Sequence, residues 1–213
     1  DGAYGLRGIN MRKGAVMTWL AILIHPYASV SEFILGHRRK YFNPVAILLM
    51  LSTFYAVVFA LVGKEFTPTA RADYPLFRWL ICSYYDYATL HPAANMLLML
   101  PFYALAMKTV FRRRSDLKYV EYLYIGIFLS VFEITLMILA LPAELFIPWY
   151  SSFYMQMLPV FIYTGFVFWK LFGLKKKGAV LRTLLVDMLQ YVYAFFAALG
   201  LLTLSLGIYY LVA

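Results

Sequence analysis

Two carboxylates interrupt stretches of this chain that are otherwise apolar, and their position makes them the first candidates for chemistry. Glu133 lies in the run 122–143, and Asp187 lies in the run 183–213. A carboxylate inside a bilayer costs on the order of 3 kcal/mol by insertion scales, so each must face protein or water, or be protonated. Glu133 therefore indicates either a structural hydrogen bond or a functional polar pocket.

Polar residues on neighbouring apolar segments define the pocket that Glu133 could join. Counting about 1.5 Å per residue from the predicted helix ends places Gln156 near the depth of Glu133, with Asn95 nearer the outer surface. We predict an intramembrane polar pocket that opens outward and is made of Glu133, Gln156, Asn95 and His91. The structural alternative is a hydrogen bond from Glu133 to Gln156, Asn95 or a tyrosine.

Asp187 lies near the opposite membrane face by the same count, roughly 10 Å from Glu133 in depth. The two carboxylates are therefore not predicted to act as a catalytic dyad. We expect Asp187 to form an ion pair at the inner face with Arg182 or with the arginines of 112–114. Gln190 shares its helix face at i+3.

Residues for other kinds of site are sparse. Cys82 is the single cysteine, which excludes a disulfide within the chain and a cysteine-based metal cluster. His25, His37 and His91 lack the spacing of metal ligands. With no Gly-rich phosphate loop and no nucleophile elbow either, we predict no catalytic residues, no metal and no cofactor.

The composition identifies the class of protein that must position these residues. The chain has 213 residues, of which 64% are hydrophobic and 14% charged. The hydrophobic share is well above, and the charged share well below, that of a typical soluble domain. A helix needs roughly 20 apolar residues to cross a hydrocarbon core of about 30 Å. We predict an all-α integral membrane protein with a domain at 44–213 of five transmembrane helices, near 44–63, 92–111, 119–141, 149–171 and 184–210.

The cations predict how the chain is threaded. With the N-terminus in the cytoplasm, all of the 19 Lys and Arg residues except Lys64, Arg71 and Arg78 fall at the inner face. This indicates a bacterial inner-membrane protein with a periplasmic C-terminus. The net charge of +9 is then explained without nucleic acid. The inner-face cations are predicted to bind anionic lipid headgroups: Arg38, Arg39, Lys40, Arg112, Arg113, Arg114, Lys175, Lys176 and Lys177.

Two segments outside the spans have their own patterns. In residues 1–43, the run 14–24 is too short to span, and 27–41 places its apolar residues on one helical stripe. These predict two short interfacial amphipathic helices, or a pair that packs under the bundle as a cap. The aromatic segment 64–92 is predicted to lie at the outer interface without crossing, because its charges leave no apolar run near 17 residues.

Three blocks of the sequence resemble a known family: "HPYASVSEFILGHRRKYFNP", "LPFYALAMKTVFRRRSDLKYVEYLYIGIFLSVFE" and "WKLFGLKKKGAVLRTLL". They are similar to an uncharacterised family of multi-pass membrane proteins of Bacteroidota, a domain of unknown function. Many relatives carry an N-terminal zinc ribbon and a Glu-His pair, whereas this chain has no such ribbon and has Glu121-Tyr122. More distantly, the layout resembles Yip1-type five-span proteins, which implies membrane organisation rather than chemistry.

Three classes of function are compatible with these features. The first is a non-catalytic membrane adaptor or organising subunit that binds the phospholipid bilayer, anionic headgroups and a protein partner or second copy. The second is a small transporter or channel that uses the pocket around Glu133. A membrane-embedded enzyme comes last, because one carboxylate with amides does not make a nucleophile, base or metal set.

Overall fold

The computed structural model describes residues 14–62, 75, 78–79, 82–84, 86–87, 91–146 and 157–212. The named elements in these ranges are all helices, which confirms the all-α class there. In chain order they are α1 (Ala15–Ile24), α2 (Pro26–Ile34), the 3₁₀ turn η1 (Arg38–Lys40), α3 (Pro44–Val62), α5 (Pro92–Phe111), α6 (Tyr119–Phe146), α8 (Met157–Leu171) and α9 (Lys176–Val212).

Three of these helices are long and apolar enough to cross a membrane within the described ranges. The stretches are Ala94–Phe111 in α5, Tyr119–Pro142 in α6 and Lys176–Gly200 in α9. They match the predicted second, third and fifth spans. The apolar stretches Pro44–Phe59 of α3 and Met157–Leu171 of α8 are shorter. The first and fourth spans, and with them the number five, therefore stay predictions.

Local sequence signals explain where the helices begin. Pro26, Pro44 and Pro92 each stand first in their helix, where the missing N–H costs nothing and the fixed φ suits the helix. Asn43 caps α3, because the Val45 N–H donates to its Oδ1 at 3.0 Å. Glu121 caps α6 by accepting from the Lys118 N–H at 2.6 Å, which is half of a capping box.

Two glycines end helices in the left-handed conformation. Gly36 has φ +99° and Gly173 has φ +57°. At the end of α8, the Leu174 N–H donates to the Trp169 carbonyl at 3.0 Å, closing a Schellman motif. The turn at Gly173 brings the chain directly from α8 into α9, so the two helices are neighbours.

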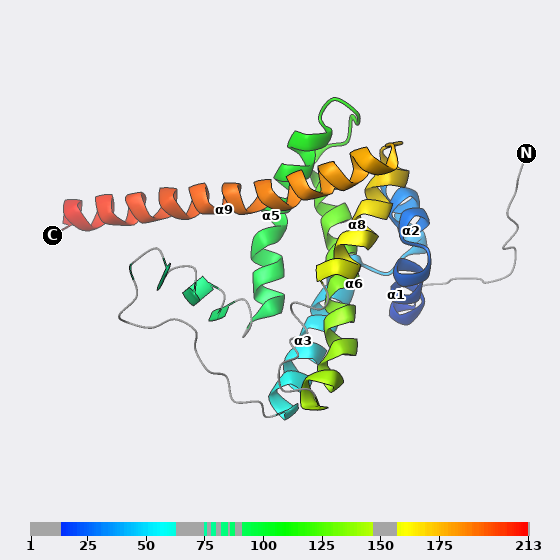
Figure 1. Cartoon of the computed structure of the whole chain (residues 1–213), viewed down its shortest axis with the longest axis horizontal. Helices are drawn as coiled ribbons and strands as arrows, with labels where there is room; N and C mark the ends of the chain where they lie inside the picture. Colours follow the sequence, from blue (N-terminus) through cyan, green and yellow to red (C-terminus); the bar gives the residue numbers. More distant parts are fainter. Residues whose placement is uncertain are drawn as a thin grey trace, which may run out of the picture.

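Helix α6 lies at the centre of the fold and packs against α3, α5, α8 and the α1–α2 pair (Figure 1). Its buried residues include Tyr122, Ile125, Phe128 and Ile134. Gly126 allows α5 to approach closely, because a Cβ there would lie 2.8 Å from Leu100 Cδ2.

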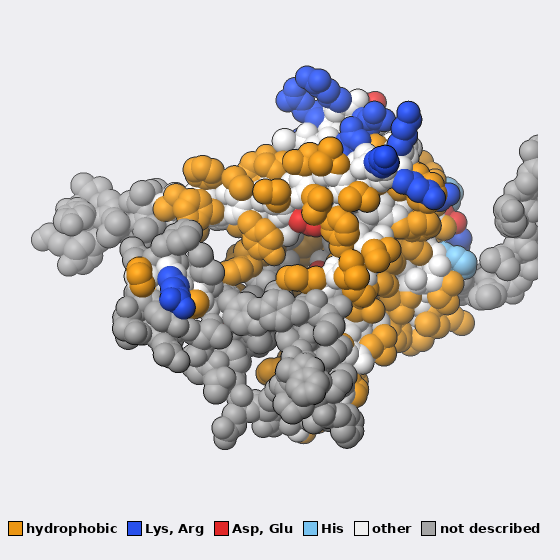
Figure 2. Space-filling view, viewed as in Figure 1, with side chains coloured by type: hydrophobic (Ala, Val, Ile, Leu, Met, Phe, Trp, Pro, Cys, Tyr) orange, Lys and Arg blue, Asp and Glu red, His pale blue; other side chains and the backbone are white. Residues whose placement is uncertain are grey.

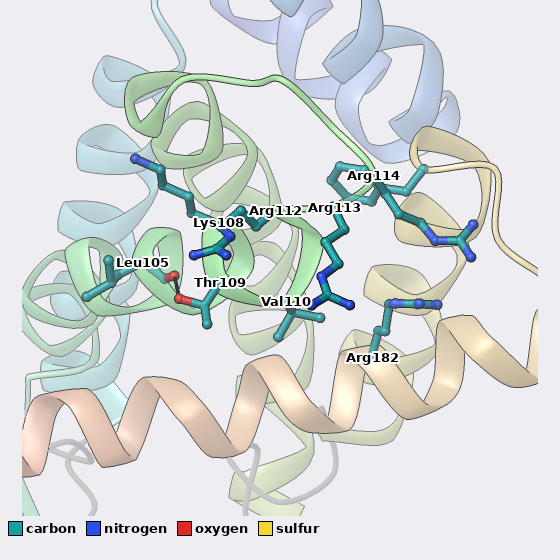
Figure 3. Close-up of a pocket in the computed structure, with 9 residues that line it drawn as sticks. Leu105, Lys108, Thr109, Val110, Arg112, Arg113, Arg114 and Arg182 are labelled. Atoms are coloured by element: carbon teal, nitrogen blue, oxygen red, sulfur yellow. Dashed lines mark hydrogen bonds between the residues drawn. The ribbon is translucent and has the colours of Figure 1, made fainter.

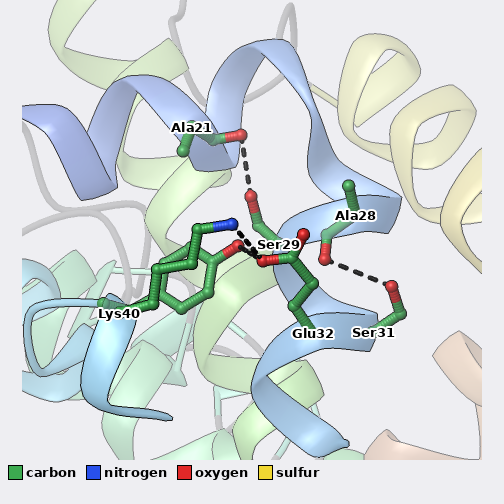
Figure 4. Close-up of polar contacts among 7 residues, drawn as sticks. Ala21, Ala28, Ser29, Ser31, Glu32 and Lys40 are labelled. Atoms are coloured by element: carbon green, nitrogen blue, oxygen red, sulfur yellow. Dashed lines mark hydrogen bonds and ion pairs between the residues drawn. The ribbon is translucent and has the colours of Figure 1, made fainter. Parts of the chain in front are cut away.

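The α1–α2 pair packs against the side of this bundle. Trp19 Nε1 donates to Thr135 Oγ1 at 2.9 Å, and the Tyr163 hydroxyl donates to the Ile22 carbonyl at 2.7 Å. Ser29 Oγ donates to the Ala21 carbonyl at 2.9 Å and ties the two helices together (Figure 4). Both predicted N-terminal helices exist and contact the bundle. Their position relative to a membrane stays a prediction.

Helix α9 has an unusual direction. It lies across α5 and α8 rather than alongside them (Figure 1). At about 1.5 Å per residue, its 37 residues extend about 55 Å, which exceeds a hydrocarbon core of about 30 Å. The helix is thus long enough to cross a bilayer at a steep tilt.

Candidate functional site

The two interior carboxylates are brought close enough to interact. Glu133 on α6 and Asp187 on α9 lie within electrostatic range of each other. The predicted difference in their depths, roughly 10 Å, stays a prediction. In the structure α9 crosses the other helices, and acidic atoms appear within a hydrophobic face of the molecule beside it (Figure 2).

Neither carboxylate has a hydrogen bond or an ion pair to another side chain that the structure describes. The ion pair expected between Asp187 and Arg182 is not formed. Residues five apart on an α-helix lie about 140° apart around its axis, so the two side chains leave α9 in different directions. Gln190 also makes no hydrogen bond to Asp187.

The other residues of the predicted polar pocket are only partly brought together. Asn95 on α5 accepts a hydrogen bond from the Tyr84 hydroxyl at 3.0 Å, not from Glu133. The His91 ring lies 5.4 Å from the Tyr87 ring. Gln156 lies outside the described residues, so its position at the membrane depth of Glu133 stays a prediction. Most of the 64–92 segment lies outside them too.

Sequence reasoning missed the tyrosines around the carboxylates. Tyr103 on α5 and Tyr191 on α9 lie within electrostatic range of both Glu133 and Asp187. Tyr84 lies within range of Glu133. A chain with 19 tyrosines offers no signal that singles out these three, because their proximity depends on how the helices cross.

Most of the cations on the face shown in Figure 2 gather at one end of the molecule, over the α5–α6 connection and the start of α9. We call this the basic end, made of six predicted headgroup-binding residues that are all exposed: Arg112, Arg113, Arg114, Lys175, Lys176 and Lys177. The ammonium of Lys176 lies 5.5 Å from the centre of the Trp169 ring, a cation–π contact that holds its stem against the fold.

The remaining three predicted cations lie beside the α1–α2 pair. The Arg38 guanidinium lies 5.5 Å from the centre of the Tyr124 ring. Tyr124 is five residues, or about 8 Å, along α6 from its first residue, Tyr119. Arg39 is exposed. Lys40 Nζ lies 2.7 Å from Glu32 Oε2 in an ion pair, so its charge is already compensated (Figure 4).

The Glu32 carboxylate also accepts a hydrogen bond from the Tyr41 hydroxyl at 2.9 Å. Burial opposes ionisation of Glu32, but the bonds from Lys40 and Tyr41 outweigh it and lower the pKa of the carboxyl below its usual 4.5. Burial and the Glu32 charge raise the pKa of Tyr41. This cluster is therefore a stable structural contact at neutral pH.

A pocket of about 940 Å³ opens at the basic end. The last turns of α5, the 112–114 turn and the first turns of α9 form its walls, so it joins segments that are far apart in sequence (Figure 3). Five cations line it: Lys108, Arg112, Arg113, Arg114 and Arg182. Sequence analysis placed Arg182 in an ion pair with Asp187, and the structure places it here instead.

Metal-binding side chains do not cluster in the residues that the structure describes. No group of three or more His, Cys, Asp or Glu residues comes together there.

Comparison with known proteins gives no relative: no protein-family model, no curated protein and no solved structure matches this chain. The similarity to the Bacteroidota family and to Yip1-type proteins therefore stays a prediction. The functional argument depends on the geometry alone.

Proposed function

We propose that this protein is a non-catalytic, multi-pass membrane adaptor or organising subunit that binds anionic phospholipid headgroups through its basic end. The observation that carries the proposal is the separation of charge from apolar surface. Exposed cations gather at the junction of α5, α6 and α9, while the described face below them is largely hydrophobic (Figure 2). Juxtamembrane cations attract anionic lipid at about 1 kcal/mol each near the surface.

The proposed arrangement in the membrane has five spans, with α3 and α8 added to α5, α6 and α9. The N-terminus is in the cytoplasm and the C-terminus in the periplasm of a bacterial inner membrane. The support is the distribution of cations along the sequence and the apolar surface of these helices. In this arrangement the basic end faces the cytoplasmic leaflet, which carries anionic lipid.

A lipid-binding experiment tests the proposed function. Detergent-solubilised protein is mixed with liposomes of phosphatidylcholine with or without phosphatidylglycerol, and bound protein is measured by flotation. We expect replacement of Arg112, Arg113 and Arg114 by Gln to weaken binding to the anionic liposomes, more so at low salt. A matched control removes Lys64 and Arg71, which are predicted to lie outside. Binding that depends on neither lipid charge nor salt would refute the proposal.

A specific observation favours a second candidate, a transporter or channel for protons or cations. Glu133, Asp187 and Tyr103 come from three different helices and lie within electrostatic range of one another. Carboxylates without a partner inside a helical bundle are typical of ion pathways. The adaptor remains first because the described polar lining is sparse and no described helix carries a repeat of this cluster.

A further inference from the structure

The residues that line the pocket at the basic end favour an anionic ligand. None of its nine described lining residues is acidic, and five are cationic. Arg113 extends from the 112–114 turn toward α9, and Arg182 rises from α9 toward that turn (Figure 3). Like charges held this close repel each other, and no ion pair to a described acid compensates the five lining cations.

The geometry of the cations suits phosphate in particular. Four of the five are arginines, whose planar guanidinium groups can each donate two parallel hydrogen bonds to phosphate oxygens. The Thr109 hydroxyl adds a polar group at the wall; it lies 3.0 Å from the Tyr193 hydroxyl, a contact that joins α5 to α9 beside the pocket. Leu105, Val110 and Phe172 supply an apolar part of the lining.

Contacts between the helix ends hold the walls of the pocket together. Phe172 is buried and stacks on Phe111, with ring centres 3.9 Å apart and an interplanar angle of 11°. This stack joins the end of α8 to the end of α5. Gly178 leaves room on α9 for Arg182, because a Cβ at that position would lie 3.3 Å from Arg182 Nη1.

We propose that this pocket, formed by Lys108, Arg112, Arg113, Arg114 and Arg182, is a discrete binding site for one phosphate group that carries more than one negative charge. The ligand class is a lipid headgroup that ends in a phosphomonoester, and this assignment rests on the proposed lipid-binding function. A phosphomonoester carries about −1.5 to −2 charges at pH 7, so it compensates more of the five cations than a phosphodiester headgroup with a single charge does. The volume of about 940 Å³ has room for a headgroup and its glycerol, and the apolar lining suits the start of an acyl chain.

Arg182 is the residue that distinguishes a discrete site from a general basic surface. It is the single pocket cation that α9 contributes, whereas the others come from α5 and its turn. A ligand that contacts both sides therefore bridges the two helices. Lys118 is the control, because it is exposed, carries the same charge and belongs neither to the pocket lining nor to the basic end.

The test measures lipid binding to the full chain in phosphatidylcholine nanodiscs by native mass spectrometry or by shift in melting temperature. Three anionic ligands are compared: phosphatidic acid, phosphatidylglycerol and soluble glycerol 3-phosphate. We expect phosphatidic acid to bind about tenfold more tightly than phosphatidylglycerol, with one molecule per chain. Arg182→Gln should reduce that affinity at least tenfold, and Lys118→Gln less than twofold. Arg113→Gln provides a second pocket variant should Arg182→Gln fold poorly in phosphatidylcholine alone.

The outcomes separate this site from the general proposal. Equal binding of the two lipids, with equal effects of Arg182→Gln and Lys118→Gln, would overturn the pocket assignment while leaving the basic end as a lipid-binding surface. No binding of either lipid would overturn both. Binding of glycerol 3-phosphate as tight as that of phosphatidic acid, lost in Arg182→Gln, would support the phosphate site but identify its ligand as a soluble phosphate compound.

Discussion

At the scale of single residues, Glu133 is the side chain for which a structural role and a role in transport can be distinguished most sharply by experiment. It has no hydrogen bond to any described side chain, although it lies within electrostatic range of Asp187. We expect Glu133→Gln to raise the melting temperature of the detergent-solubilised protein or leave it unchanged. The variant removes a carboxylate that is costly in an apolar environment and keeps the shape of the side chain.

The same variant decides between the two candidate functions. In proteoliposomes loaded with a pH-sensitive dye, the parent would conduct protons or cations if transport is the function, and Glu133→Gln would abolish that flux. Binding of anionic lipid at the basic end should be the same for both proteins. A parent without flux removes the transport alternative, and a marked loss of stability in the variant would show that Glu133 has a structural partner.

The Glu32–Lys40 ion pair predicts a pH dependence. The pKa of Glu32 is lowered in the folded protein, so its contribution to stability is present above the unfolded pKa of about 4.5 and is lost as the pH falls through the lower folded value. Both side chains are more than a third exposed, at 48% for Lys40 and 37% for Glu32, so solvent screens the pair. We expect a coupling energy of less than about 1 kcal/mol at pH 7.

A double-mutant cycle measures this coupling. Thermal or denaturant unfolding is followed for the parent, Glu32→Gln, Lys40→Met and the double variant at pH 7 and pH 3. The coupling should decline at the lower pH. A coupling that is unchanged between the two pH values would contradict the assigned ion pair.

At the scale of elements, Gly126 sets the distance between α5 and α6. A Cβ there would lie 2.8 Å from Leu100 Cδ2 and 3.3 Å from Tyr103 Cδ1. Gly126→Leu should therefore destabilise the protein by about 1–3 kcal/mol, the usual cost of overpacking a filled interface. The measurement is the melting temperature in detergent. Gly200→Leu on α9 serves as the control, since a Cβ there meets nothing within 4 Å.

The packing of the helices at this contact also affects the candidate sites. Tyr103 lies beside Gly126 and within range of both interior carboxylates. Separation of α5 from α6 would therefore move Tyr103 relative to Glu133 as well as disturb the hydrophobic core. A Gly126→Leu protein as stable as Gly200→Leu would show that the α5–α6 interface is looser than the structure indicates.

At the scale of the whole molecule, the predicted threading has a direct test. Alkaline phosphatase fused after Ala213 should be active, and green fluorescent protein at the same place should be dark, because the C-terminus is expected in the periplasm. Fusions after Lys118 serve as the control and should give the opposite pattern. A cytoplasmic signal after Ala213 would mean an even number of spans and would refute the predicted threading.

Local sequence properties indicated a membrane protein, and they predicted the helices and many of the residues at which these begin and end. The apolar runs and the prolines before them predicted α3 and α5 to within a residue, and the chain also showed where its cations cluster. These features could be derived because hydropathy, capping and the φ restriction of proline act over a few residues. Local patterns could not predict that Glu133, Asp187 and Tyr103 lie near one another, or which residues line the basic pocket.

Tertiary structure alone decided which faces meet. The crossing of α9 over α5 places Arg182 with the 112–114 turn in one pocket. Asp187 on α9 lies within electrostatic range of Glu133 on α6. The contact of Trp19 with Thr135 likewise joins residues 116 positions apart. Such pairings depend on crossing angles and on small residues such as Gly126, which follow from the packing of whole helix surfaces and leave no local pattern in the sequence.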